Sequence, residues 1–342
     1  MTDQSKIPLP PEGREPAGKS LFERATQTFD LGSLNPAAMP DRLAPPPAKR
    51  LRPRAEPSAA VTQVAAPVPP SEPVAQSAVP PAIEAQPAGP AVEPLRFEGE
   101  RHHVDRDWLR EQGLVVPDGP VTALLEEFRI VKRQVLQAIR GAAGGNRRSR
   151  AQRILVCSPH PGEGKTFCSV NLALSIAAER DCEVLLVDAD FAKPSILSRL
   201  RLPGGPGLMD VLSDPALPVE RCVIGTDIPG LWVLPAGNRT SADSEYLASA
   251  RAAEVIERLT QGAPNRVVIF DSPPALAASP AAELAKHVGQ ALLIARADCT
   301  GQSALEDAVS LLSACPDIKL LLNAARFSPS GRSFGTYYGY GD

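Results

Sequence analysis

Short runs of apolar residues alternate with longer amphipathic stretches over the second half of the chain. The runs are apolar at nearly every position rather than at every second one, which is typical of parallel strands covered on both faces. They occupy 153–158, 183–190, 230–237, 266–274, 290–297 and 318–325, and helical patterns lie between them at 165–180, 245–260 and 302–313. The alternation predicts an α/β fold with a mostly parallel central sheet and helices on both faces.

A longer helical pattern precedes the first of these runs. Over 121–140 the apolar residues recur at helical spacing, and the segment GAAGGNRRSR at 141–150 is expected to break the helix. We therefore place the folded domain at 104–331, with the helix at 121–140 as its first long element.

The N-terminal 103 residues have a different composition. Proline accounts for 37 of the 342 residues and concentrates between about 44 and 94, where aromatic residues are almost absent. Such a segment buries too little apolar surface to offset chain entropy, so we expect residues 1–103 to be a disordered arm. A short amphipathic helix is predicted within it at 19–34.

Charge and cysteine content give no sign of a nucleic-acid-binding protein or of a CxxC-type metal or redox site. The net charge of −3 does not indicate a nucleic-acid binder, and the basic run at 49–54 is interpreted as a solubilising cluster. None of the six cysteines forms a CxxC pair. The polar N-terminus lacks a secretory signal and no apolar run approaches the roughly 20 residues of a spanning helix, so a cytoplasmic location is expected.

The segment CSPHPGEGKTF, at the end of the first strand and the start of a helix, is typical of a phosphate loop. Glycines let backbone N–H groups surround an anion, and the helix directs its positive end toward the same anion. The lysine would reach the β- and γ-phosphates of a nucleotide, and the threonine hydroxyl would bind Mg²⁺. The predicted ATP-binding residues are Pro161, Gly162, Glu163, Gly164, Lys165, Thr166 and Phe167.

Two further predicted strands end in carboxylates. LLVDAD supplies Asp188 and Asp190, and VVIFDSPP supplies Asp271. Carboxylates beside a phosphate loop can hold Mg²⁺ directly or through water, and one of them can accept a proton from an attacking hydroxyl. We expect Thr166, Asp188 and Asp271 at the metal.

The motifs SPHPGEGKT, LLVDADFAKPS and VVIFDSPP resemble the three Walker-type motifs of bacterial tyrosine autokinases of polysaccharide export. The resemblance covers roughly 104–342 and looks closest to the exosortase-associated (PEP-CTERM/XrtA) branch. It implies a P-loop NTPase fold and an ATP- and Mg²⁺-dependent kinase that phosphorylates its own tail, with Lys165, Asp188 and Asp190 as catalytic residues. It also implies a homo-oligomer in which one subunit phosphorylates another, with subunit contacts made by Glu126, Arg129 and Lys132. The implied partner is a membrane-anchored polysaccharide co-polymerase (chain-length determinant) that recruits the chain to the inner face of the plasma membrane.

Three of the four tyrosines, Tyr337, Tyr338 and Tyr340, lie in the glycine-spaced ending FGTYYGYGD. Glycine leaves the backbone free to enter a cleft, and the tether keeps the phenols at high local concentration. We therefore interpret residues 332–342 as a flexible phosphoacceptor tail.

The sequence departs from the family pattern at Ala192, where most relatives carry arginine; Lys193 follows and lacks the guanidinium fork. This keeps two alternatives open, a nucleotide-switch ATPase of the partitioning class without kinase activity, and a weakly active regulatory scaffold. The first alternative is disfavoured by His160, because those ATPases carry a signature lysine at that place.

Overall fold

The computed structural model describes residues 93–142 and 144–325. The helix predicted at 19–34, the rest of the proline-rich region up to residue 92, and the tyrosine-bearing tail lie outside the described residues. All described residues belong to one compact unit, which contains the predicted sheet.

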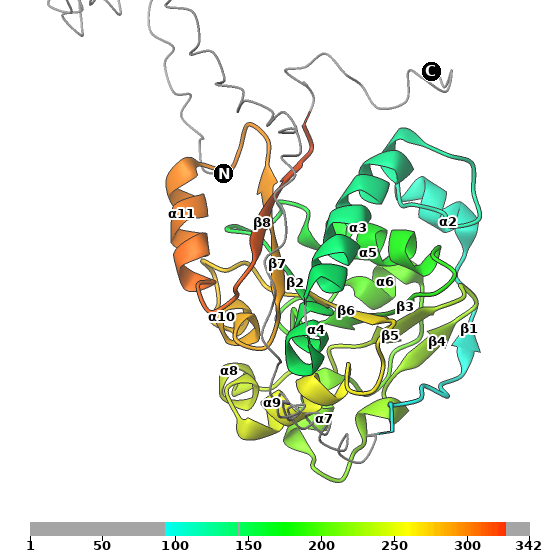
Figure 1. Cartoon of the computed structure of the whole chain (residues 1–342), viewed down its shortest axis with the longest axis vertical. Coiled ribbons are helices and arrows are strands. Elements are labelled where there is room, and N and C mark those ends of the chain that lie inside the picture. Colours follow the sequence, from blue (N-terminus) through cyan, green and yellow to red (C-terminus); the bar gives the residue numbers. More distant parts are fainter. Residues whose placement is uncertain (1–92, 143, 326–342) are drawn as a thin grey trace, which may run out of the picture. The chain divides into compact units, whose positions relative to one another are not determined.

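Within the described residues, eight strands form a single sheet that includes all six predicted runs (Figure 1). Across the sheet lie, in order, β1 (Arg101–His102), β4 (Ile224–Thr226), β5 (Leu231–Leu234), β3 (Glu183–Asp188), β6 (Arg266–Asp271), β2 (Arg153–Cys157), β7 (Gln290–Arg296) and β8 (Ile318–Asn323). Every neighbouring pair is parallel except β4 and β5. The prediction of a mostly parallel sheet is confirmed.

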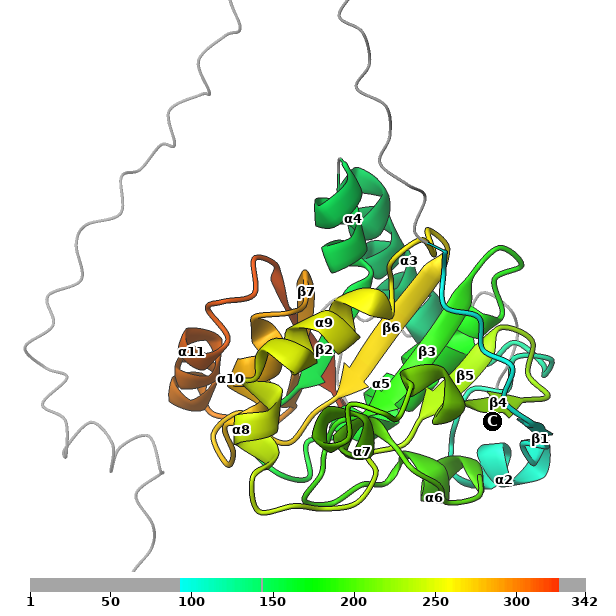
Figure 2. The same ribbon diagram turned by 90° about the horizontal axis from the view of Figure 1, so that it is seen from below.

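Helices cover both faces of the sheet (Figures 1 and 2). In chain order they are α2 (Arg106–Glu111), α3 (Ala123–Gly141), α4 (Gly145–Ala151), α5 (Lys165–Ala177), α6 (Ile196–Leu200), α7 (Leu208–Ser213), the 3₁₀ turn Val219–Arg221, α8 (Asp243–Leu247), α9 (Ala250–Arg258), α10 (Pro280–Ala285) and α11 (Gln302–Leu311). Helices α2 to α6 contribute to one apolar core, and α7 to α11 contribute to the core on the opposite face. Because both faces are covered, the central strands are buried along their whole length.

Helix α3 follows the predicted pattern and packs against α5. The Thr122 hydroxyl accepts a hydrogen bond from the Leu125 N–H at 3.2 Å, which caps the first turn. Along the contact, the rings of Phe128 and Phe167 meet edge to face with their centroids 6.5 Å apart. Helix α3 is therefore held against α5, the helix that begins at the predicted phosphate loop.

Two predicted helix limits are wrong. The break expected over 141–150 is confined to a few residues, because Gly144 adopts a φ of 84° and α4 starts directly after it. The single helix expected over 245–260 divides into α8 and α9, because Ser249 leaves the helical conformation and its hydroxyl caps α9 by accepting from the Ala252 N–H. The positive φ of Gly144 sets the start of α4, and the capping hydrogen bond of Ser249 sets the start of α9.

The fold also includes residues 93–103, which the sequence assigned to the N-terminal arm. Leu95 and Phe97 are buried, and β1 extends the edge of the sheet. The Arg266 guanidinium lies 4.0 Å from the centroid of the Phe97 ring and donates to the Leu95 carbonyl oxygen at 2.6 Å. The boundary at 104 is therefore too late, because buried Leu95 and Phe97, the contacts of Arg266 and the pairing of β1 with β4 hold this segment on the core.

Three central strands end at the same edge of the sheet. Asp188 at the end of β3 is the register partner of Asp271 at the end of β6, and Val156 near the end of β2 is the partner of Asp271 on the other side. The segment after β2 and both carboxylates are therefore brought together by strand register.

In the part of the chain that the structure describes, no helix is both long and apolar enough to cross a membrane.

Candidate functional site

The loop between β2 and α5 has the backbone conformation that a phosphate loop requires. Gly162 and Gly164 adopt φ values of 80° and 99°, in the region that favours glycine. Gly164 caps α5, whose first N–H groups have no partner within the helix and so point toward a ligand. A Cβ at Gly164 would lie 2.1 Å from the Asn323 Nδ2 atom, so a side chain there would displace Asn323 in addition to straining the backbone.

Contacts from β7 and β8 hold this loop in place. Asn323 Nδ2 donates to the Glu163 carbonyl oxygen at 2.9 Å, and Arg296 Nη1 donates to the Gly162 carbonyl oxygen at 3.1 Å. The Glu163 carboxylate accepts the His160 N–H at 2.8 Å and the Thr300 hydroxyl. The Glu163 side chain therefore stabilises the loop and is buried, although the sequence grouped it with residues that contact the nucleotide.

Thr166 and Asp271 form the floor of the site. The Thr166 hydroxyl donates to Asp271 Oδ2 at 2.6 Å, and the Ser169 hydroxyl donates to Oδ1 at 3.0 Å. Asp271 is fully buried, and burial raises its pKa to about 7, against the lowering effect of the Thr166 hydrogen bond. A cation near this carboxylate would favour its ionised form, so the position suits a metal ion.

Asp188 lies beside Asp271 and organises the segment that follows it. Its carboxylate accepts the N–H groups of Asp190 at 3.2 Å, Ser195 at 2.9 Å and Ile196 at 3.0 Å. Burial raises the pKa of Asp188 to about 6, and these three hydrogen bonds oppose the shift. Asp188 thus joins the acidic pair at the floor and shapes the turn that carries Asp190.

A cavity of about 470 Å³ opens above this floor. Among the predicted residues, Pro161, Gly162, Gly164, Lys165, Thr166, Phe167 and Asp190 line it. The same cavity is lined by Ala192 and Lys193, where the sequence departs from the family pattern, and by Arg199 from α6. Structure and strand register therefore bring together the predicted phosphate-loop residues and the three strand-end carboxylates.

The residues fit a magnesium–nucleotide. Backbone N–H groups at the start of α5 and the ammonium of Lys165 suit phosphate oxygens. The hydroxyl of Thr166 and the carboxylate of Asp271 are oxygen ligands of the kind Mg²⁺ prefers. The two glycines with positive φ keep side chains out of the curve of the loop.

The three residues predicted for subunit contact lie on α3 in different environments. Glu126 and Arg129 pair with each other and are partly exposed. Lys132 is buried, and its ammonium binds Glu179 at 2.6 Å and the Ser175 carbonyl oxygen at 3.2 Å within the same chain. Glu126 and Arg129 keep side-chain surface for a partner, whereas Lys132 is already engaged, and the contact role remains a prediction.

Sequence reasoning missed the residues that support the loop from the far strands. Arg296, Thr300 and Asn323 come from segments 130 to 160 residues away from the loop they contact. Ser195 was also missed; its hydroxyl donates to the Thr166 hydroxyl oxygen at 3.2 Å. Asn323 ends a run that is apolar except for Lys319, and a polar residue at a strand end was a signal of the same kind as Asp188 and Asp271.

Comparisons with known proteins point to bacterial tyrosine-protein kinases. No family model matches the chain. The chain is 30% identical over 191 residues to the tyrosine-protein kinase YwqD of Bacillus subtilis (strain 168), a match that covers 55% of this chain and 78% of YwqD. It is 32% identical over 158 residues to the tyrosine-protein kinase ptk of Acinetobacter johnsonii, which covers 46% of this chain and 21% of that protein.

The solved kinase domain of the Escherichia coli tyrosine kinase ETK has a similar fold. It matches with a TM-score of 0.53 at 22% sequence identity, over 68% of this chain and 98% of that chain. The chain spans only about a quarter of the length of the first curated relatives it matches.

Proposed function

This chain belongs to the family of bacterial tyrosine-protein kinases, and from that premise we propose that it transfers the γ-phosphoryl group of ATP to tyrosine hydroxyls of its own C-terminal tail. The observation that carries the proposal is the hydrogen bond of 2.6 Å between the Thr166 hydroxyl and Asp271. It joins the phosphate loop to the carboxylate of a second strand and so assembles the floor of a magnesium–nucleotide site. The acceptors are Tyr337, Tyr338 and Tyr340.

The reaction is an in-line displacement. The tyrosine Oη attacks the γ-phosphorus, the bond to the β–γ bridging oxygen breaks, ADP leaves, and the phenolic proton passes to a carboxylate. Lys165 would bind the β- and γ-phosphates, and Thr166, Asp271 and Asp188 would hold Mg²⁺. The ion, when bound, neutralises charge that develops on the phosphate oxygens.

Asp190 is the carboxylate that accepts the proton. Its side chain borders the cavity, where an incoming phenol would lie. The Asp188 oxygens, in contrast, are engaged by three backbone N–H groups and are almost fully buried. Lys193 in the same cavity supplies positive charge one residue after Ala192, which occupies the place where most relatives carry an arginine.

The biological setting follows from the resemblance stated above. We propose that the chain acts in exopolysaccharide or capsule production, in the exosortase-associated branch of the family. Its partners would be further copies of itself and a membrane-anchored co-polymerase. Phosphates on the tail, each adding about −1.5 to −2 charges, would repel the carboxylates of the site and so release the tail from a neighbouring subunit.

Mass spectrometry after incubation with Mg²⁺-ATP tests the proposal. We expect phosphotyrosine on the tail of the unmodified chain, none in Lys165→Met, and none when Tyr337, Tyr338 and Tyr340 are changed to Phe. The matched control is Tyr246→Phe, which removes the remaining tyrosine, packed against the core, and leaves tail phosphorylation unchanged.

Mixing two inactive chains tests transfer between subunits. Lys165→Met keeps the acceptors, and the triple Phe variant keeps the site, so phosphotyrosine on the Lys165→Met chain demonstrates transfer in trans. Release of phosphate without phosphotyrosine would instead identify a nucleotide-switch ATPase. Loss of both products, also with the membrane partner added, would identify a regulatory scaffold.

A further inference from the structure

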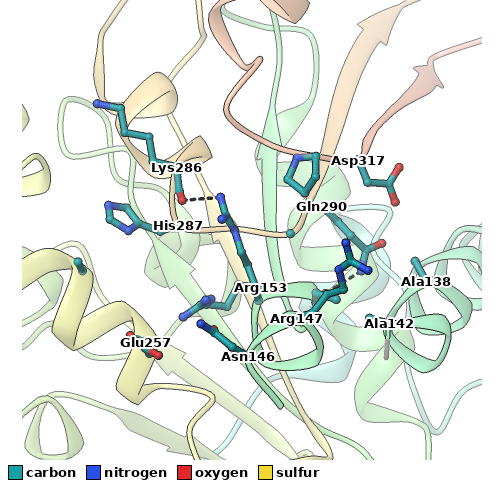
Figure 3. A pocket seen from close by; sticks show the side chains of 15 residues that line it. Ala138, Ala142, Asn146, Arg147, Arg153, Glu257, Lys286, His287, Gln290 and Asp317 are labelled. Atoms are coloured by element: carbon teal, nitrogen blue, oxygen red, sulfur yellow. Dashed lines mark hydrogen bonds between the residues drawn. The ribbon is translucent and has the colours of Figure 1, made fainter. Parts of the chain in front are cut away.

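A second cavity lies at the amino-terminal ends of β2 and β7, whereas the phosphate loop follows the carboxyl end of β2. Figure 3 shows the side chains that line this cavity. Its volume is about 600 Å³, within the range of pockets that bind small molecules. The end of α3, helices α4 and α9, and the segments that lead into β7 and β8 form its walls, and Arg153 at the start of β2 also lines it. The carboxylates and glycines of the kinase site take no part in it.

Positive charge predominates on the walls. The charged side chains that line the cavity are the cations Arg147, Arg150, Arg153 and Lys286 and the carboxylates Glu257 and Asp317. Lys286 pairs with Glu283 at 2.7 Å, and Asp317 pairs with Lys319. After these pairings three arginines face one carboxylate, so the cavity has an excess of about two positive charges.

Arg153 is the least solvated of the three arginines. It is 5% exposed, and its Nη1 donates to the Ile256 carbonyl oxygen at 3.3 Å. Its Nε has no hydrogen-bond partner among the described residues, where the only other such buried side-chain atom is the Ser175 hydroxyl oxygen. Because Nε is also shielded from solvent, a ligand in the cavity would bind the guanidinium through its Nη groups, where a buried cation strongly favours an anionic acceptor.

The electrostatic environment of Arg153 supports this description. Burial lowers its pKa to about 10, and Glu257 opposes that shift, so the guanidinium stays charged at neutral pH. Burial, and then the charges of Arg153 and Arg150, lower the pKa of His287. Figure 3 shows Arg153 between His287 and Glu257, with Asn146 beside it.

The walls are held rigidly by Arg150. Its Nε donates to the Val288 carbonyl oxygen at 3.0 Å and its Nη2 donates to the Lys286 carbonyl oxygen at 2.6 Å. Gly289 lies so close to α4 that a Cβ would be 2.6 Å from the Arg150 carbonyl oxygen. The cavity is therefore built by specific contacts between α4 and the segment before β7.

We propose that this cavity binds a small phosphorylated molecule, with Arg153 and Arg147 binding its phosphate. A phosphate group at neutral pH carries close to two negative charges and several acceptor oxygens, which match the excess charge and the guanidinium donors of Arg153 and Arg147. The guanidinium fork suits phosphate geometry better than an ammonium does. This binding site is separate from the kinase site, and the proposal does not depend on kinase activity.

Calorimetric titration of the full chain with inorganic phosphate and with pyrophosphate, in the Lys165→Met background, tests the site. We expect one bound pyrophosphate per chain and a dissociation constant that rises about tenfold in Arg147→Gln, the loss of one charge-assisted hydrogen bond. The matched control is Arg148→Gln, on the same helix but outside the cavity lining, which should leave the constant unchanged. Arg153→Lys keeps the charge but removes the planar guanidinium fork and should weaken binding by at least about tenfold.

Three results would overturn the proposal. The first is that millimolar pyrophosphate does not bind. The second is that Arg147→Gln and Arg148→Gln bind pyrophosphate with the same dissociation constant. The third is that a tail-derived phosphotyrosine peptide binds the chain whereas pyrophosphate does not. Circular dichroism checks the folding of each variant. If Arg153→Lys does not fold, Arg147→Gln decides the question, because Arg147 is exposed and its removal leaves the core intact.

Discussion

Asp271→Asn is expected to make the metal-free protein more stable while it abolishes magnesium–nucleotide binding. Asp271 is fully buried at the end of β6, and both of its oxygens accept hydroxyl hydrogen bonds. Asparagine has nearly the same shape, and its amide can exchange hydrogen bonds with the same two hydroxyls, which both donate and accept. The substitution therefore removes a charge and little else.

The size of the effect follows from the pKa. Burial raises the pKa of Asp271 from 3.8 to about 7, so the folded protein holds this proton over a pH range in which the unfolded chain has lost it. The free energy of unfolding therefore falls as the pH rises between these two values, by about 1.4 kcal/mol per pH unit. The stability lost above pH 7 is about 4 kcal/mol, and about 2 kcal/mol of it is already lost at pH 5.

Asparagine does not ionise, so Asp271→Asn should exceed the unmodified chain in stability by about 4 kcal/mol at about pH 8 and by about 2 kcal/mol at about pH 5. Urea unfolding with a chelator present measures both differences. Asp307→Asn, on the exposed side of α11, is the matched control and should change neither value. With Mg²⁺-ATP added, the unmodified chain should gain stability and Asp271→Asn should not.

Two outcomes would refute this reasoning. One is an Asp271→Asn chain that is less stable than the unmodified chain at about pH 8. The other is a stability difference that is the same at both pH values, which would show that the Asp271 charge is not the source.

Three further predictions concern the architecture around the site. Gly164→Ala should abolish binding of a fluorescent ATP analogue, because the new Cβ would lie 2.1 Å from the Asn323 side chain and the backbone φ of 99° is strained for alanine. Gly204→Ala is the control in the same assay, because a Cβ there has no atom within 4 Å. Thr122→Ala should lower the free energy of unfolding by about 1 kcal/mol through loss of the α3 cap, whereas Thr122→Ser should not. Arg266→Leu should release the segment around Phe97 and make it susceptible to limited proteolysis; unchanged protection would show that apolar packing alone holds it.

The sequence by itself determined the layered α/β class, the six main strands and the phosphate loop. These features are local, since a continuous apolar run predicts a buried strand and the spacing of Gly162, Gly164, Lys165 and Thr166 predicts the turn. The three strand-end carboxylates were also predictable, because the carboxyl ends of parallel strands meet at one edge of a sheet.

Only the tertiary structure decided which groups complete the site and which are engaged elsewhere. Strand order places β7 beside β2 and β8 beside β7, so that Arg296 and Asn323 reach the loop, and no local pattern encodes that neighbourhood. The same holds for Arg153, which reads as the first residue of a strand but becomes a buried cation in a second cavity once five separate segments pack around it. The burial and the charge environment of a side chain depend on residues that lie far apart in the chain. Only folding brings those residues together, so neither property can be predicted from a local pattern.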